Sequence, residues 1–484
     1  MNKILLIFLI ITLTISFGCL EEKNGIGKAV KLIPADNIAI EKTSTIQKET
    51  HSKCSNQQCI EVQGIGTNEC RSNSDCTGMN LDEMLNMCYG LTQQECNQYK
   101  VKFVKTIIEK YKYYHKNSNE LFNQYEKDNL FIEWDNNLSE SIGSPVGGHF
   151  TDPVYSYPLT KIYNTDFNRV LEELKKKHII FNYFVHGNPT TAGFGLNLNE
   201  TESERNKIYT TNEEFINFAF ENGSPALLVD AKACGSWIIW DNKDQFCCWP
   251  QAMTGSGVWL YMDPFGGYEY QQNLQKKLSS GEIAGKSLLE VSRSELYLHG
   301  DITAHLPGNG TEELSCGWAN KLGVDCVCSP PEEKNKLGII IKQNGIYNNP
   351  ELVNSINQFI DAVKIDTGIS GSLYKFSGSS FEELDSFIEN LYDISNVAYV
   401  IIIGTDLPVA ETIESDGLQL VGAQELGTVN NVIENDIGCY DVAISYILPP
   451  LHYPQNCKKG ETNCVEGQLY KCNDYNWVST GENC

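Results

Sequence analysis

Basic residues are scarce in this chain of 484 residues: 37 lysines and arginines stand against 62 aspartates and glutamates, giving a net charge of −25. Proteins that bind nucleic acid neutralise phosphates with clustered lysine and arginine, so nucleic acid is excluded as a partner. The same deficit argues against direct binding to an anionic membrane surface. Such a chain is self-repelling and soluble, and its length suggests two or three domains with small modules.

The chain also lacks the motifs of several large enzyme classes. It contains no phosphate-binding Walker A loop, no HExxH zinc motif and no EF-hand calcium loop. After the N-terminus, no apolar run is long enough to span a membrane. A function must therefore be sought in less obvious arrangements of side chains.

The N-terminus is typical of an export signal. Lys3 precedes an apolar run over residues 4–15, which is short for a transmembrane helix. A small residue then precedes Cys19, as at a lipoprotein processing site, so we expect residues 1–18 to be a signal peptide and Cys19 to be lipidated. Plain secretion or an uncleaved anchor is the alternative. The expected location is extracytoplasmic, at the cell surface or secreted, with membrane contact only through this lipid or anchor.

Eighteen cysteines in an exported chain predict disulfides rather than zinc sites. Apart from Cys19 and Cys234 they fall into three groups, each of even number. These groups are Cys54, Cys59, Cys70, Cys76, Cys88 and Cys96; Cys247, Cys248, Cys316, Cys326, Cys328 and Cys439; and Cys457, Cys464, Cys472 and Cys484. The parity allows Cys19 to be lipidated and Cys234 to be a free thiol.

Composition and hydrophobic periodicity predict an α/β protein with small disulfide-rich terminal modules. Helices are expected over 97–127 and 166–177, and buried strands at 178–187 and 225–235. The pattern restarts after residue 336. There we expect strands at 337–342, 397–408 and 440–450, a helix at 350–368 closed by Gly368, and a helix at 380–393 capped by Ser380. The predicted units are a signal peptide (1–18), a polar tether (19–50), a Cys-rich segment (51–96), a first α/β domain (97–330), a second α/β unit (331–450) and a Cys-rich β module (451–484).

His186 and Cys234 are candidates for a catalytic pair. Each follows a predicted parallel strand, and the carboxyl ends of neighbouring parallel strands meet at one edge of a sheet. A cysteine nucleophile needs a base to form thiolate and donors to hold an oxyanion; the backbone N–H of Gly187 is one possible donor. The alternatives are a core histidine at 186 and a disulfide from Cys234 to Cys247 or Cys248.

Several blocks resemble the gingipain-type cysteine peptidases, a branch of the caspase-like clan. The stretch "FNYFVHG" is similar to that family's strand ending in His-Gly, and "LLVDAKACGSW" to its strand ending at the nucleophile. The blocks "CCWPQAMTGSG" and "LYLHGDITAHL" follow in family order, the latter with Gly300-Asp301 and with Ile302 where the family has proline. In the second unit, "VAYVIIIGTDLPVAETIESDG" and "YDVAISYILPP" resemble the non-catalytic half, which here follows the catalytic half instead of preceding it.

This resemblance implies a caspase-like, flavodoxin-like parallel sheet and a cysteine endopeptidase acting on protein or peptide substrates. His186 would be the general base and Cys234 the nucleophile, with the Gly187 and Cys234 amides forming the oxyanion hole. Asp152 is a candidate for orienting His186 or for a substrate pocket, and otherwise a turn residue. No cofactor is required, and structural calcium is possible by resemblance. The competing hypothesis is an inactive surface lipoprotein that binds or scaffolds.

The remaining histidines and tryptophans have structural interpretations. We expect His149 and His299 to be loop and structural histidines. The tryptophans are expected in the core or in cleft walls; they are Trp237, Trp240, Trp249 and Trp259.

Overall fold

The computed structural model describes only part of the chain. Elsewhere the placement of residues is not described. The described residues are 50–55, 58–63, 88, 91–133, 155–163, 167–185, 191–192, 210–233, 238–241, 248–264, 269–291, 296–308, 313–314, 316–317, 325–413, 417–420, 426, 438–450, 462–465, 468–473 and 476–483.

A ten-stranded sheet forms the centre of the molecule, in the order β13-β12-β14-β17-β11-β10-β8-β5-β3-β4. Its strands are β3 (Glu126–Glu133), β4 (Leu159–Tyr163), β5 (His178–Phe184), β8 (Ala226–Lys232), β10 (Leu260–Pro264), β11 (Leu296–Gly300), β12 (Lys336–Lys342), β13 (Gly371–Phe376), β14 (Val397–Ile403) and β17 (Ala443–Ile447). Most of the central strands are buried on both faces and therefore read as continuous apolar runs.

The sheet consists of two parallel blocks that run in opposite directions. Strands β4, β3, β5, β8 and β10 are mutually parallel, and so are β11, β17, β14, β12 and β13. The blocks meet at the antiparallel pair β10–β11. Outward from the centre, β8-β5-β3-β4 and β17-β14-β12-β13 follow the same chain order: fourth, third, first, second. The second block therefore repeats the topology of the first, with β14 equivalent to β5 and β17 equivalent to β8.

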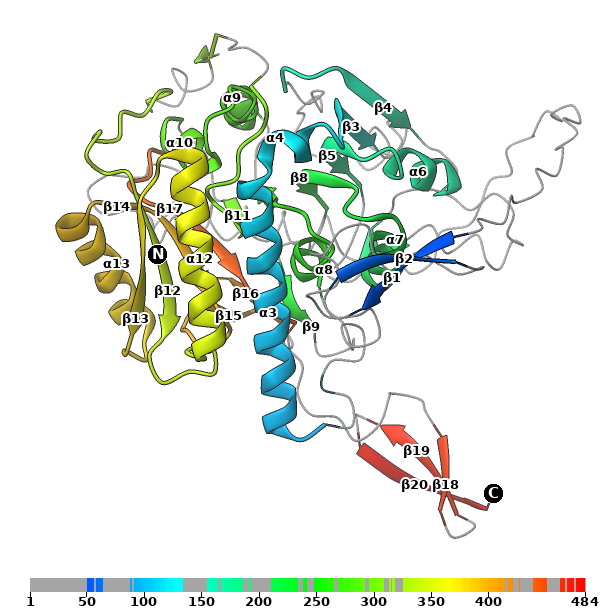
Figure 1. Cartoon of the computed structure of the whole chain (residues 1–484). Coiled ribbons are helices and arrows are strands. Elements are labelled where there is room, and N and C mark those ends of the chain that lie inside the picture. The colour runs from blue at the N-terminus through cyan, green and yellow to red at the C-terminus, as the bar shows by residue number, and fades with distance from the viewer. Residues whose placement is uncertain are drawn as a thin grey trace, which may run out of the picture.

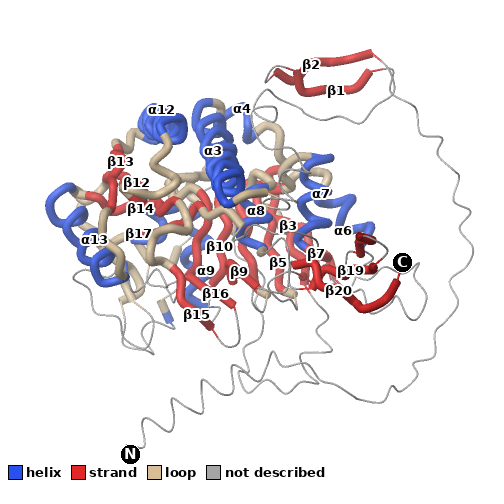
Figure 2. Tube along the Cα trace, turned by 90° about the horizontal axis from the view of Figure 1, so that it is seen from below, coloured by secondary structure: helices blue, strands red, loops and turns tan. Residues whose placement is uncertain are grey.

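Helices cover both faces of the sheet (Figures 1 and 2). Helices α3 and α12 lie side by side on one face. They run parallel, since Lys105 pairs with Glu351 and, two turns further along both helices, Lys112 contacts Gln358. Helix α13 packs on the opposite face of the second block. The helices are α3 (Gln93–Lys116), α4 (Ser118–Phe122), α6 (Phe167–Leu174), α7 (Asn212–Asn222), α8 (Trp249–Gly255), α9 (Glu269–Leu278), α10 (Ala284–Leu289), α12 (Pro350–Thr367) and α13 (Phe381–Ser395).

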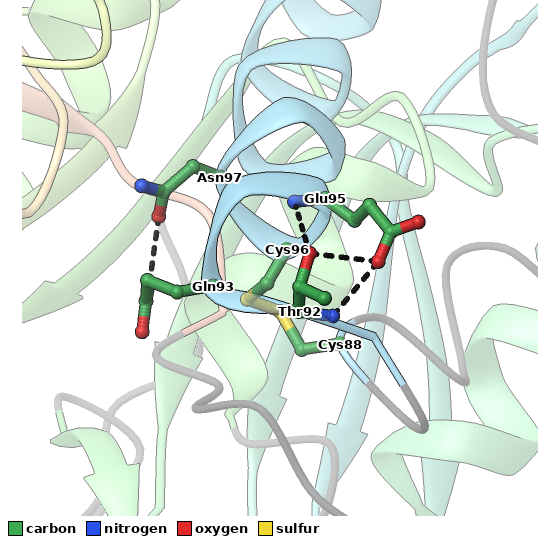
Figure 3. Close-up of a disulfide and its surroundings, with 6 residues drawn as sticks. All are labelled: Cys88, Thr92, Gln93, Glu95, Cys96 and Asn97. Carbon is green, nitrogen blue, oxygen red and sulfur yellow. Dashed lines mark hydrogen bonds between the residues drawn. A yellow bond between two sulfur atoms is a disulfide. The ribbon is translucent and has the colours of Figure 1, made fainter.

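Helix α3 begins earlier and ends earlier than the predicted range 97–127. Thr92 and Glu95 form a reciprocal capping box, and the disulfide Cys88–Cys96 fixes the first turn (Figure 3). The capping box satisfies N–H groups that open a helix, the disulfide anchors the first turn to the preceding chain, and together they explain the start at Gln93. The stretch that begins at Glu126 belongs to β3, not to the helix, because it pairs with β5 and β4 in the sheet.

Two helix boundaries predicted in the second unit, the end of α12 at Gly368 and the start of α13 at Ser380, are confirmed, whereas α13 extends two residues beyond the predicted residue 393. Ser380 accepts a hydrogen bond from the backbone N–H of Glu383 and caps α13. Gly368 closes α12 in the left-handed conformation, with φ +79°, which costs glycine little because it has no Cβ. Strand β14 breaks at Gly404, also at positive φ. Capping chemistry is local, and for this reason the sequence alone could predict it.

Small sheets lie outside the main one. They are the hairpin of β1 (Thr50–Ser55) and β2 (Gln58–Gln63), the pair β6 (Thr191–Ala192) and β7 (Thr210–Thr211), the trio β9 (Ile238–Asp241), β15 (Ala410–Ile413) and β16 (Gly417–Leu420), and the C-terminal trio β18 (Thr462–Val465), β19 (Gln468–Asn473) and β20 (Asn476–Asn483). Strand β9 of the first half pairs with β16 of the second. The two halves are therefore also joined outside the main sheet.

The predicted α/β class is confirmed, with both predicted α/β units contributing to one sheet. The disulfide Cys316–Cys326 lies within the first unit, and the disulfide Cys328–Cys439 links the first unit to the second. Disulfides persist in oxidising, extracytoplasmic compartments, which agrees with the expected compartment. Among the described helices, none has the length and apolarity to cross a membrane.

Candidate functional site

The carboxyl ends of β5 and β8 lie next to each other at one edge of the sheet. The two strands are parallel neighbours, and their register pairs Asn182 with Asp230 and Phe184 with Lys232. The backbone N–H of Val185 donates to the carbonyl of Lys232 at 3.1 Å, so the pairing continues past the end of β5. Carboxyl edges of parallel sheets are where side chains of open α/β proteins do chemistry.

The predicted site residues themselves lie outside the described residues. This holds for His186, Gly187 and Cys234, and also for Asp152 and the lipidation candidate Cys19. Chain numbering alone places positions 186 and 234 two residues beyond Phe184 and Lys232, which face each other in the register. The structure thus describes the strands that precede the predicted pair and does not describe the pair.

A buried polar cluster lies on the same strands, and the sequence analysis missed it. One carboxylate oxygen of Asp230, Oδ2, accepts hydrogen bonds from Asn182 at 3.0 Å, Gln275 of α9 at 2.8 Å and Tyr155 at 3.2 Å. Burial and the nearby carboxylate of Asp230 raise the pKa of the Tyr155 hydroxyl well above its usual range, so this hydroxyl remains a donor. The signal available in the sequence was one polar residue inside each apolar run, "FNYF" and "LLVDA".

The segment after β8 leads to a disulfide-bonded cysteine. Cys248 precedes α8, and Pro250 lies in the first turn of this helix. Proline is favourable there because backbone N–H groups in the first turn have no acceptor within the helix, so the N–H that proline lacks is not missed. Cys248 is fully buried and disulfide-bonded. The partner of Cys248 is not among the cysteines of the three described disulfides, which are Cys88–Cys96, Cys316–Cys326 and Cys328–Cys439.

A second cluster lies at the opposite edge, where α3, α12 and the segment after β11 meet. His115, in the last turn of α3, contacts Asp301 through Nε2 at 2.7 Å and Asp366 through Nδ1 at 2.8 Å. His305 contacts the same oxygen of Asp366, Oδ2, at 2.8 Å. Because β11 runs antiparallel to β10, Gly300-Asp301 lies at the edge where β5 and β8 begin. This block of the family resemblance therefore does not lie at the carboxyl edge of β5 and β8.

The electrostatics of this second cluster favour opposite charges held together. Burial disfavours a charged His115, but the carboxylates of Asp301 and Asp366 outweigh burial and raise the pKa of His115 to about 9. Burial likewise opposes ionisation of Asp366, yet hydrogen bonds from His115, His305 and Ser118 hold the pKa of Asp366 well below its usual range. The cluster is a buried, charged junction of three segments distant in sequence.

Gly300 sets the path of the chain into this junction. Its φ is +110°, and a Cβ at this position would lie 2.5 Å from the carbonyl oxygen of Trp259. Only glycine combines this conformation with so close an approach. The neighbouring Asp301 is thereby brought under the indole N–H of Trp259, which donates to Oδ2 at 2.8 Å.

The histidines and tryptophans given structural interpretations are buried wherever their side chains are described. His299 lies in β11 between Tyr261 and Tyr446, and burial lowers its pKa to about 3. Trp249 and Trp259 are fully buried. His149 and Trp237 lie outside the described residues, and of Trp240 only its place in β9 is described.

Comparisons with family models, with curated proteins and with solved structures find no match for this chain.

Proposed function

We propose that the protein is an extracytoplasmic cysteine endopeptidase, surface-anchored through Cys19 or secreted, in which His186 is the general base and Cys234 the nucleophile. The observation that carries the proposal is the register of β5 and β8, which pairs Phe184 with Lys232. Positions 186 and 234 follow this pair at equal distances along neighbouring parallel strands. Because both positions lie two residues beyond a register pair, the side chains of His186 and Cys234 are expected to start from neighbouring positions on the two strands. A general base and a nucleophile need such proximity to come within hydrogen-bond reach.

The alternation of side chains along strands supports the same pairing. Successive residues of a strand point to opposite faces, so positions 182, 184 and 186 share one parity, as do 230, 232 and 234. Asn182 and Asp230 meet on one face of the sheet. If this alternation continues for two residues, His186 and Cys234 belong to that same face.

The second half of the sheet offers an internal comparison. By topology, β14 corresponds to β5 and β17 to β8. The residues two positions beyond these strands are Thr405 and Pro449, which supply neither a histidine base nor a cysteine nucleophile. Catalytic chemistry is therefore proposed for the first half alone, with the second half as a structural repeat, as in the non-catalytic half of the gingipain-type family.

In the proposed reaction, His186 removes the proton of the Cys234 thiol, and the thiolate attacks the carbonyl carbon of a peptide bond. The backbone N–H groups of Gly187 and Cys234 would stabilise the oxyanion. The proton on His186 then passes to the leaving amine, and water hydrolyses the thioester. Asp152 is proposed as a residue that orients His186 or lines a substrate pocket.

A second candidate function follows from the disulfide bond of Cys248. Cys234 is among the cysteines that remain as possible partners for Cys248. A Cys234–Cys248 disulfide would remove the nucleophile and leave a binding or scaffolding protein with the same fold. The two functions are distinguished by the redox state of Cys234.

Labelling with an acyloxymethyl-ketone peptide probe tests the proposal. The wild-type chain should be labelled at Cys234, and hydrolysis of a peptide library should fall by at least about 10³-fold in both Cys234→Ala and His186→Ala. His149→Ala is the matched control and should retain labelling, because residue 149 is predicted to lie in a loop. Equal labelling of wild type and Cys234→Ala would refute the enzymatic proposal.

A further inference from the structure

We propose that His115, His305 and Asp366 form a binding site for one divalent transition-metal ion of the zinc class. These three side chains come from α3, from the segment after β11 and from α12. Their ligand atoms all lie within 4.8 Å of one another. The proposal concerns the edge of the sheet opposite the carboxyl ends of β5 and β8, and it does not depend on the proposed peptidase activity.

The ligand atoms are close to the arrangement that a tetrahedral zinc ion requires. Oδ2 of Asp366 lies 2.8 Å from Nδ1 of His115 and 2.8 Å from Nε2 of His305. Zinc bonds of about 2.0–2.1 Å place neighbouring ligand atoms about 3.3 Å apart. An ion can therefore enter if the Asp366 oxygen withdraws by about 0.5 Å and the two imidazoles approach each other. Both Asp366 and His305 are partly exposed, so their side chains have room to adjust.

The groups around the ligands have the pattern of an outer coordination shell. Nε2 of His115 faces the fully buried Asp301, which is held by the Trp259 indole at 2.8 Å and by the backbone N–H of Thr303 at 2.8 Å. The second oxygen of Asp366, Oδ1, accepts from Ser118 at 2.8 Å. Metal-ligating histidines usually donate their other N–H to a carboxylate in this way, which fixes the ring and raises its basicity.

The charge distribution favours a cation. Asp301 and Asp366 form their described ion pairs only with imidazoles, not with lysine or arginine. His115 and Asp366 also lie in the last turns of α3 and α12, where the carbonyl ends of both helices add partial negative charge. A divalent ion bound to Nδ1 of His115 in place of its proton would balance the carboxylates of Asp301 and Asp366.

The ligand types select the kind of ion, and a cleft gives access to it. Two imidazole nitrogens with one carboxylate oxygen suit zinc-class ions, whereas calcium takes oxygen ligands. This site therefore does not match the structural calcium that the resemblance allows. His305 and Asp366 line a cleft of about 930 Å³ together with Lys286, Glu290 and Tyr399, so a fourth position can be filled from solvent.

Metal binding by the untagged full-length chain, with its disulfides intact, tests the proposal. After dialysis against a chelator, Zn²⁺ is titrated in competition with a chromophoric indicator. We expect one equivalent to bind with micromolar or tighter affinity and to raise the melting temperature, while Ca²⁺ should do neither. If wild type binds no Zn²⁺, or if Ca²⁺ competes equally, the cluster is only an ion-paired junction and the proposal is wrong.

Three variants assign the binding to this cluster. His305→Ala removes a partly exposed ligand and should weaken Zn²⁺ binding at least 100-fold, by analogy with the losses known for outer-shell changes. Asp301→Asn should weaken it about 10–100-fold through His115. Glu290→Gln, in the same cleft but outside the cluster, should bind as wild type does. Unchanged affinity in a folded His305→Ala protein would overturn the assignment, even if Asp301→Asn fails to fold.

Discussion

At the scale of single residues, His299 illustrates the cost of a buried ionisable group. Its Nε2 atom has no hydrogen-bond partner among the described residues, and burial lowers its pKa to about 3. The unfolded chain has a histidine pKa of about 6.5. Between these values the unfolded state binds one proton more than the folded state, so stability falls as the pH falls below 6.5.

Replacement of His299 should therefore make the fold less sensitive to acid. From pH 6.5 to pH 5 the wild type should lose about 2 kcal/mol of unfolding free energy through this residue, and His299→Phe should not. Urea unfolding of both proteins at the two pH values measures the difference. Equal losses in wild type and variant would show that His299 does not carry this sensitivity.

Asp230, in contrast to His299, is a buried side chain that accepts hydrogen bonds from several buried donors. Substitution by alanine leaves the donors of Asn182, Gln275 and Tyr155 without their acceptor, which should cost about 3–5 kcal/mol. Asp230→Asn keeps an acceptor oxygen and the shape, so its cost should be about 1–2 kcal/mol. Chemical denaturation at pH 7 compares the two; an alanine variant as stable as the asparagine variant would contradict this account.

At the scale of elements, capping explains what the sequence could predict. The C-terminal end of α12 and the start of α13 were predictable because Gly368 and Ser380 act on their own helices. Strand β3 was not, because "EKDNLFIE" carries no pattern that separates it from the preceding helix. It is a strand because β4 and β5 lie on either side of it, and such long-range pairing overrides local preference.

Loss of the α13 cap should have a modest and specific effect. Ser380→Ala removes the acceptor for the Glu383 N–H and should lower the unfolding free energy by about 1 kcal/mol. Ser380→Asp keeps an acceptor at the cap and is the matched control, with an expected change of a few tenths of a kcal/mol. Urea unfolding measures both; equal destabilisation by the two substitutions would argue against a capping role.

At the scale of the whole molecule, the sequence indicated two α/β units but not their union. The two units join where β11 pairs with β17, with His299 opposite Tyr446, and the two parallel blocks meet at the antiparallel pair β10–β11. No local pattern encodes these contacts, since they join segments far apart in the chain. The junction of His115, Asp301, His305 and Asp366 escaped prediction for the same reason, because three distant segments form it.

The strand positions behind the proposed active edge were predictable because β5 and β8 are long apolar runs with distinctive ends. Their adjacency and register come from the structure. Because the two halves repeat the same topology, the residues that follow their equivalent strands can be compared. One half carries a histidine and a cysteine beyond equivalent strands, and the other carries Thr405 and Pro449.

The pH dependence of alkylation at Cys234 by iodoacetamide, followed by peptide mapping, tests the central claim most directly. The account predicts a free thiol at Cys234 that reacts well below the usual cysteine pKa of about 8.5, with a profile that shifts upward in His186→Ala. A Cys234 found in a disulfide with Cys247 or Cys248, or an identical profile in wild type and His186→Ala, would contradict it.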